Sequence, residues 1–154
     1  MDALRRSYQA VKTALEQEAI KGDATAIGLS LELSKPTFVA ALLLLSDVLA
    51  ILGNLSHQTF QIEGLNLISV EQLITSSLTS LSDLKADPFK GGYLSTLPEM
   101  LSTQGITAPL DQESFKTQAQ SYIARVIENI KSHFPQVHLL TCLSVIIPIM
   151  PRLL

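Results

Sequence analysis

The sequence predicts an all-α protein, an irregular helical bundle of about five to seven helices around one long apolar central helix. Two features carry this prediction. The stretch from Phe38 to Gln61 is apolar over a longer distance than any other part of the 154-residue chain. The segments around it repeat apolar residues every three or four positions, which is the period of an amphipathic helix. The length suits one domain, so we expect residues 1–154 to form a single all-helical domain.

The first expected helix carries one apolar stripe and ends at Gly22, because glycine favours the position just after a helix. Four apolar positions are too few for a stable isolated coiled coil. We therefore expect the stripe to pack on the central helix. It consists of Leu4, Tyr8, Val11 and Leu15.

Residues 24–33 leave two conformations open. Leu29, Leu31 and Leu33 alternate with other residues, as they would in a strand. The neighbouring segments are helical, however, and a lone strand has no partner for its backbone hydrogen bonds. We expect either a short helix or an extended connector.

The central helix is expected from Lys35 to about Gln61, with Pro36 in its first turn. Its most apolar part, Phe38 to Leu55, just reaches the length of a membrane span. Asp47 near the middle of that part would cost about 2.5–3.5 kcal/mol on insertion into a bilayer. We therefore expect a buried core helix, in which Asp47 is structural or faces solvent. If Asp47 is buried, it needs a polar partner.

A third amphipathic helix is expected from Ser69, because Ser69 and Gln72 have the spacing of a capping box. Its serine and threonine side chains are expected on the solvent face, Ser77 among them. Its expected buried stripe is Val70, Leu73, Ile74, Leu78 and Leu81.

Two further helices are expected in the second half of the chain. A short one runs from Tyr93 to Leu101, after a loop in which Lys90-Gly91-Gly92 lacks the residue order of a phosphate-binding loop. A long one runs from Asp111 to Phe134, where the apolar period is clearest and Asp111 suits the N-cap. Its expected core face is Phe115, Ala119, Tyr122, Ile123, Val126, Ile127, Ile130 and Phe134.

The C-terminal residues 138–154 are apolar, but Pro148 and Pro151 prevent a long helix. His138 and Cys142 are too few for a zinc site, which needs three or four ligands. An end this apolar predicts a truncated chain and a surface that packs on another protein or subunit. The candidate packing residues are Leu139, Leu140, Leu143, Ile146 and Ile147.

Composition and charge narrow the function classes. A hydrophobic content of 47% with only 16% charged residues excludes disorder and leaves apolar surface for a partner. The net charge of −3 and the absence of tryptophan disfavour a nucleic-acid binder. The single cysteine excludes an internal disulfide and suits a reducing compartment. No nucleophile–base pair, paired-acid motif or nucleotide loop is found, so we expect no enzyme, no metal and no cofactor.

The order of segments from Phe38 onward resembles a known family. LSDVLAILGNLSHQTFQ (residues 45–61) leads through IEGLNLISVEQLITSSLTSLSDLK (residues 62–85). Downstream follow SFKTQAQSYIARVIENIKSHFP (residues 114–135) and LLTCLSVI (residues 139–146). This order is similar to the helical insertion region of hAT-superfamily transposase-derived proteins, in particular the vertebrate zinc-finger proteins domesticated from these transposases.

The resemblance covers about residues 3–146. It implies a transposase insertion domain without its RNase H-like catalytic core, truncated at both ends. It further implies a nuclear setting and no residual catalysis, because no acid of this chain matches a catalytic position. The insertion tryptophan that stabilises flipped DNA in active relatives, the BED-type zinc finger and the C-terminal dimerisation segment are all missing from this sequence.

These observations together predict a non-catalytic helical protein-interaction module that binds a protein partner or a second copy through apolar surface. Two alternatives stay open. One is a remnant DNA-binding surface with Arg5, Arg6 and Lys12. The other is a small membrane-associated helical protein, which Asp47 disfavours. The expected location is nuclear or cytoplasmic, nuclear by resemblance alone.

Overall fold

The computed structural model describes residues 2–60 and 67–134, and all regular structure in these two ranges is helical. Six α-helices and one 3-10 helix form the described part, which confirms the predicted all-α bundle. The elements are α1 (Asp2–Ile20), α2 (Ala24–Leu33), α3 (Pro36–Phe60), α4 (Leu67–Ala86), η1 (Leu94–Thr96), α5 (Leu97–Thr103) and α6 (Gln112–His133).

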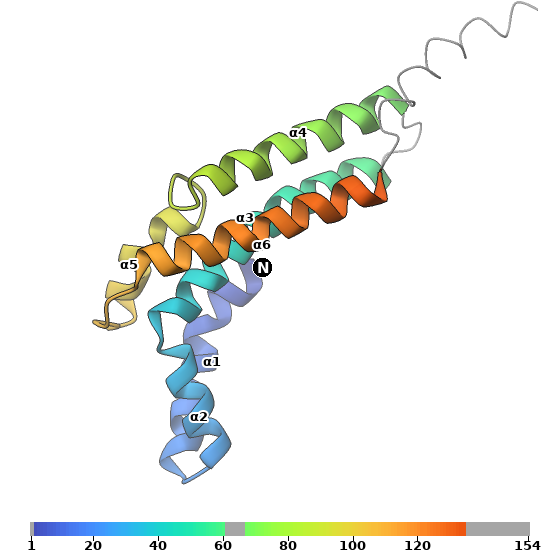
Figure 1. Cartoon of the computed structure of the whole chain (residues 1–154). Coiled ribbons are helices and arrows are strands. Elements are labelled where there is room, and N and C mark those ends of the chain that lie inside the picture. The colour runs from blue at the N-terminus through green and yellow to red at the C-terminus, as the bar shows by residue number, and fades with distance from the viewer. Residues whose placement is uncertain (1, 61–66, 135–154) are drawn as a thin grey trace, which may run out of the picture.

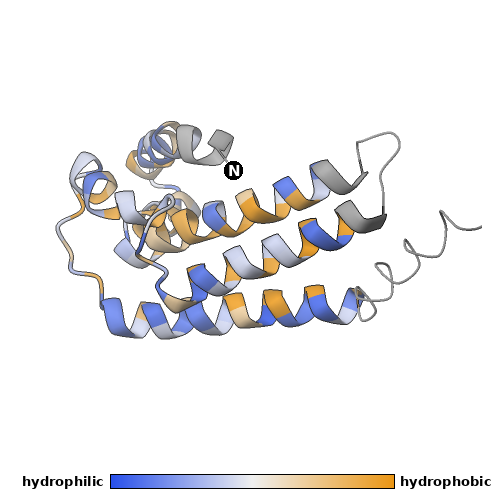
Figure 2. Ribbon diagram, turned by 90° about the horizontal axis from the view of Figure 1, so that it is seen from above, coloured by the Kyte–Doolittle hydropathy of each residue, from blue (hydrophilic) through white to orange (hydrophobic). Residues whose placement is uncertain are grey.

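Helix α3 is the centre of the bundle, as its apolar sequence predicted. It contacts every other helix of the described part. Helices α3, α4 and α6 run side by side, and α1 and α2 form a hairpin that projects away from them (Figures 1 and 2). α5 and η1 pack on the end of α3 that lies nearest the hairpin. The molecule therefore has a three-helix body and a two-helix arm.

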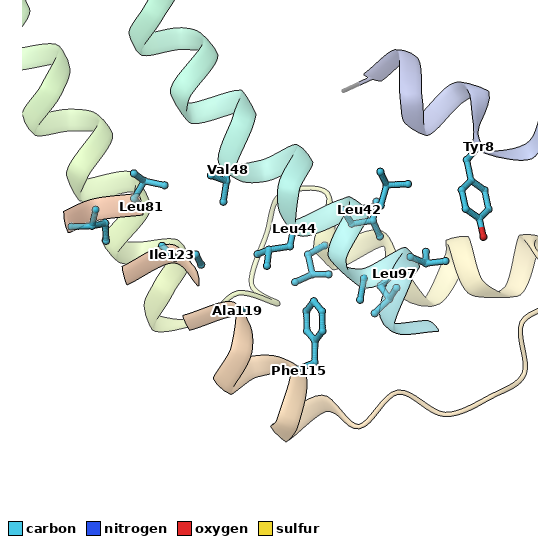
Figure 3. Packing of buried hydrophobic residues seen from close by; sticks show 14 residues of the cluster. Tyr8, Leu42, Leu44, Val48, Leu81, Leu97, Phe115, Ala119 and Ile123 are labelled. Carbon is cyan, nitrogen blue, oxygen red and sulfur yellow. The ribbon is translucent and has the colours of Figure 1, made fainter. Parts of the chain in front are cut away.

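The core lies where α3 meets the other helices. Figure 3 shows side chains of α3, α4 and α6 meeting between the ribbons. Leucine surrounds α3 in this region, and Leu42, Leu43 and Leu44 are all buried although they point in different directions. Burial around most of the helix circumference explains the continuous apolar run, since each side of α3 meets a different neighbour. Among the largest fully buried side chains are Val39, Leu43, Val48, Ile74, Leu81, Leu94 and Ile123.

Helix α6 agrees closely with its predicted pattern. The Asp111 carboxylate caps its first turn by accepting a hydrogen bond of 3.1 Å from the backbone N–H of Ser114. Its core face lies against α3 and α4. Tyr122 and Phe134, which were also predicted on this face, are exposed, because Tyr122 lies at its edge and Phe134 follows the last residue of the helix. The buried residues of the face are Phe115, Ala119, Ile123 and Ile127.

Two local predictions for α4 are wrong. Helix α4 starts at Leu67, so Ser69 lies inside the helix instead of capping it. Ser77, expected on the solvent face, is buried between Ile74 and Leu81 on the packed side. The other hydroxyl side chains described between residues 70 and 86 face solvent, and Thr79, Ser80 and Ser82 donate to carbonyls one turn earlier.

Residues 24–33 form a helix. Gly22 ends α1 in the left-handed conformation at φ +92°, and the N–H of Asp23 reaches back to the carbonyl of Glu18. The Asp23 carboxylate then caps α2, accepting hydrogen bonds of 2.8 and 3.3 Å from the N–H groups of Thr25 and Ala26. The turn and the cap start a helix here although the leucines alternate.

Tyr8 joins the arm to the body. Among the members of the predicted α1 stripe whose side chains the structure describes, Tyr8 is buried, whereas Val11 is exposed. Its ring stacks on Phe38 with centroids 6.4 Å apart, and its hydroxyl donates to the carbonyl of Leu33 at the end of α2. Burial raises the pKa of Tyr8 above its ordinary value, and the nearby Glu16 charge adds to the rise. The tyrosine therefore fixes α1 against the α2–α3 junction in its neutral form.

Candidate functional site

The buried carboxylate of Asp47 is structural, one of the two roles expected for it. Its oxygens accept hydrogen bonds from the backbone N–H groups of Tyr93 and Leu94, at 2.6 and 3.0 Å. These N–H groups stand at the start of η1, where helix geometry leaves donors without partners. A negative side chain at this position satisfies them, so Asp47 of α3 caps a helix that lies far along the chain.

The loop before η1 is shaped around that carboxylate. Gly91 and Gly92 both have positive φ, +83° and +66°. A Cβ added to Gly92 would lie 2.3 Å from the Asp47 Oδ1 atom, whereas one added to Gly91 would meet nothing within 4 Å. Gly92 is therefore required by close approach as well as by backbone conformation. The N–H groups of Tyr93 and Leu94, which follow this loop, already donate to Asp47 and are not free to bind a phosphate.

An open groove of about 800 Å³ lies beside this contact, between α3, the end of α4 and the loop. Its charged lining residues are Asp47, Asp83, Asp87 and Lys90. Three carboxylates against one ammonium disfavour the binding of a nucleic-acid phosphate. Among the residues that the structure describes, no three His, Cys, Asp or Glu side chains are grouped as metal ligands.

One described helix has the length and composition of a membrane span. Pro36–His57 of α3 has a mean hydropathy of 2.2, and 44% of its most apolar window is buried inside the bundle. The core helix of a soluble protein has the same properties, so this finding alone is weak support for a membrane location. The Asp47 cap and the contacts with all the other helices give α3 a structural role inside the bundle.

The second candidate surface is the outer side of α2. Ala24, Ile27, Gly28 and Leu31 follow the i, i+3, i+4, i+7 spacing that places residues on one helix face, and all four are exposed. We call these four residues the α2 stripe. Leu31 is 63% exposed and Ile27 43%. The opposite side of α2 carries the buried Ala26 and packs on α1 and α3.

Charges near the α2 stripe are paired within the arm. Glu32 forms an ion pair with Lys35, and Glu18 pairs with Lys21 at the other end of the hairpin, 2.7 Å apart. Glu32 is the only charged residue of α2 itself. The stripe is therefore an apolar surface whose neighbouring charges are balanced by ion pairs, except for the Asp23 carboxylate beside Ala24.

The sequence-predicted site residues are not brought together here. Lys12 donates a hydrogen bond of 3.3 Å to the carbonyl of Gln104 and lies 4.0 Å from Glu16, and its side chain is only 11% exposed. It joins α1 to the end of α5, which leaves its ammonium little surface for a phosphate. The side chains of Arg5 and Arg6 lie outside the described residues. The DNA contact stays a prediction.

The predicted partner-packing residues also lie outside the described ranges. They are Leu139, Leu140, Leu143, Ile146 and Ile147. The α2 stripe is an apolar surface that was not among those predicted from the sequence. A wheel plot of residues 24–33, drawn once a helix is assumed, would have placed its four members on one face.

The fold, with the groove beside Asp47 and the α2 stripe, defines the structural class of the protein as an all-α helical bundle with a projecting hairpin. Comparison of the chain with models of protein families, with curated proteins and with solved structures finds no match. The resemblance to hAT-superfamily transposase-derived proteins therefore stays a prediction.

Proposed function

We propose that this chain is a non-catalytic helical protein-interaction module, and that it binds through the α2 stripe. One observation carries the proposal: a ten-residue helix exposes Ile27 and Leu31 side by side while its other face is packed. A helix that is apolar on both sides is stable in water when both sides are covered. α1 and α3 cover one side. A protein partner is the natural cover for the other.

The arm exposes two further large apolar residues outside the α2 stripe. Ile20, at the end of α1, is 86% exposed, and Leu29 on the flank of α2 is about half exposed. Single exposed apolar residues are normal on soluble proteins, whereas a contiguous group marks an interaction site. The arm projects from the body, which makes this surface accessible to another molecule (Figure 1).

Sequence features support the same function. The low charge content predicts apolar contact with a partner. The resemblance to a transposase insertion region favours a structural and binding role over catalysis, and it favours a nuclear location. The apolar residues 138–154 would add a second contact surface under the same proposal.

The proposal is tested by binding of an environment-sensitive hydrophobic dye to the full chain and to Leu31→Ser. Leu49→Ser in α3 is the matched control, because Leu49 is also an exposed helical leucine, at 42%. Leu31→Ser should lower dye binding more than Leu49→Ser, with both variants retaining the helical circular dichroism of the parent chain. Equal dye binding by the parent and Leu31→Ser would overturn the α2 stripe as the binding surface.

A further inference from the structure

We propose that the partner of the α2 stripe is a second copy of this chain, bound antiparallel across a two-fold axis that passes between Ile27 and Gly28. This inference rests on the proposed function and names the partner of the same surface. The observation behind it is the order of large and small residues along the stripe. Small Ala24 and Gly28 alternate with large Ile27 and Leu31.

The spacing makes the stripe self-complementary. Ala24 is three residues before Ile27, and Gly28 is three residues before Leu31, so the stripe keeps its register when it is reversed. In the antiparallel pair Ile27 of each chain lies opposite Gly28 of the other, and Leu31 lies opposite Ala24. Each large side chain then meets a small one, which allows the close packing that interior contacts require. A parallel pair would place Ile27 against Ile27 and leave a gap between the glycines.

Gly28 has the space that this packing needs. A Cβ built on it meets nothing within 4 Å, and the residue is exposed, so the helix backbone at this point is open to a neighbour. Glycine in a helix interior is destabilising relative to alanine, and neither a turn nor a positive φ explains this one. A closely packed partner helix would explain it.

Charge neither selects nor excludes an identical partner. The ion pairs Glu18–Lys21 and Glu32–Lys35 balance the charges near the stripe except for Asp23, so a strongly charged partner finds little complement there. The antiparallel register does bring Asp23 near Glu32 of the other copy. That contact is mild, because the Asp23 carboxylate is held by the α2 cap and Glu32 is already paired with Lys35.

The expected dimer is weak. A ten-residue helix is about 15 Å long, and an interface this short falls below the roughly 1,200 Å² of a standard stable complex. Two-fold dimers are the commonest closed assemblies, and small interfaces of this kind are reversible. We therefore expect a monomer–dimer equilibrium in the micromolar range, visible as a rise in mass from 16.7 kDa with concentration.

The first test is sedimentation of the full chain over a wide concentration range, with Gly28→Leu as the disrupting variant. A leucine at position 28 would collide with Ile27 of the other copy and weaken the dimer about tenfold or more. It should not harm the fold, because it meets nothing within 4 Å in the monomer. Gly53→Leu in α3 is the matched control, since Gly53 is also exposed, helical and free of neighbours at its Cβ.

The second test fixes the register. Ala24→Glu and Leu31→Lys should each abolish self-association, because each places like charges or an unpaired charge in the contact. A mixture of the two variants should associate again, because the new carboxylate on one chain faces the new ammonium on the other and the remaining Leu31–Ala24 contact is intact. Failure of the mixture to associate, while Gly28→Leu does weaken the dimer, would overturn the antiparallel register.

The outcomes separate this inference from the proposed function. A chain that stays monomeric at all concentrations, yet loses dye binding in Leu31→Ser, overturns the second copy as partner and leaves the interaction surface standing. A dimer unaffected by Gly28→Leu also overturns the inference, because the contact then lies elsewhere. A monomer with no Leu31-dependent dye binding overturns both.

Discussion

Replacing Gly92 by alanine should push the Asp47 carboxylate off the two N–H groups that it caps. The new methyl group would lie 2.3 Å from Oδ1 and 2.7 Å from Cγ, far inside van der Waals contact. The side chain of Asp47 must move, and its bonds to Tyr93 and Leu94 are lost. Because alanine at φ +66° is also strained, two separate costs combine in this variant.

The magnitude follows from these two costs. Left-handed backbone at a non-glycine residue costs about 1–2 kcal/mol. Loss of buried hydrogen bonds to a charged group costs about 1.5–3 kcal/mol each when the donors stay unsatisfied, and partial rehydration lowers the sum. We expect Gly92→Ala to lower the free energy of unfolding by about 3–5 kcal/mol. Gly91→Ala should cost only the backbone term, about 1–2 kcal/mol, because its Cβ meets nothing within 4 Å.

The assay is urea unfolding of the full chain, followed by far-UV circular dichroism, with Asp47→Ala as the second arm of a double-mutant cycle. Asp47→Ala alone should cost about 3 kcal/mol, since it removes the carboxylate to which both N–H groups donate. In that background Gly92→Ala should cost only the backbone term, so the two substitutions are strongly non-additive. Additive costs, or equal costs for Gly91→Ala and Gly92→Ala, would refute the reasoning.

Two further predictions concern the core and the arm. Leu43→Ala should lower the free energy of unfolding by about 3 kcal/mol, because Leu43 is fully buried at the centre of α3, and Leu49→Ala in the same helix should cost under about 1 kcal/mol in the same urea titration. The raised pKa of Tyr8 means that, above pH 10.0, the folded chain keeps a proton which the unfolded chain releases. The stability that Tyr8 contributes is therefore complete below pH 10.0 and is lost as the pH rises through the folded pKa. Tyr8→Phe should remove that loss, and thermal unfolding on both sides of pH 10.0 measures it; an equal loss in Tyr8→Phe would contradict the assignment to Tyr8.

Much of the architecture could be predicted from the sequence because local patterns determine it. The α6 face follows from apolar residues at helical spacing, and its start follows from Asp111. The central position of α3 follows from leucine on every side. In each case the residues that predict the helix belong to the same segment that forms it.

The remaining features depend on residues far apart in the chain or on competing local signals. The need of Asp47 for a partner was predictable, but its partners at Tyr93 and Leu94 come from a loop that only the tertiary fold brings to it. Alternating leucines in residues 24–33 matched a strand, and the Asp23 cap together with the lack of a pairing strand favoured the helix. At Ser69 a matching capping pair lies within a longer helix, so the motif alone did not locate the helix start.

The α2 stripe could not be predicted as a surface while the conformation of residues 24–33 was open. A strand would have placed Leu29, Leu31 and Leu33 together. In the helix Leu29 and Leu33 share one face, and Leu31 is grouped with Ile27 on the other. The candidate site therefore depends on the one element for which the sequence left two conformations.

The most direct test of the central claim, that the α2 stripe is a binding surface for a second copy, is hydrogen–deuterium exchange of the full chain at low and at high concentration. Amides of residues 24–33 should exchange more slowly at high concentration, while amides of the buried middle of α3 should not change. Protection of α2 that is the same at both concentrations, in samples whose mass shows association, would place the contact elsewhere and contradict the account.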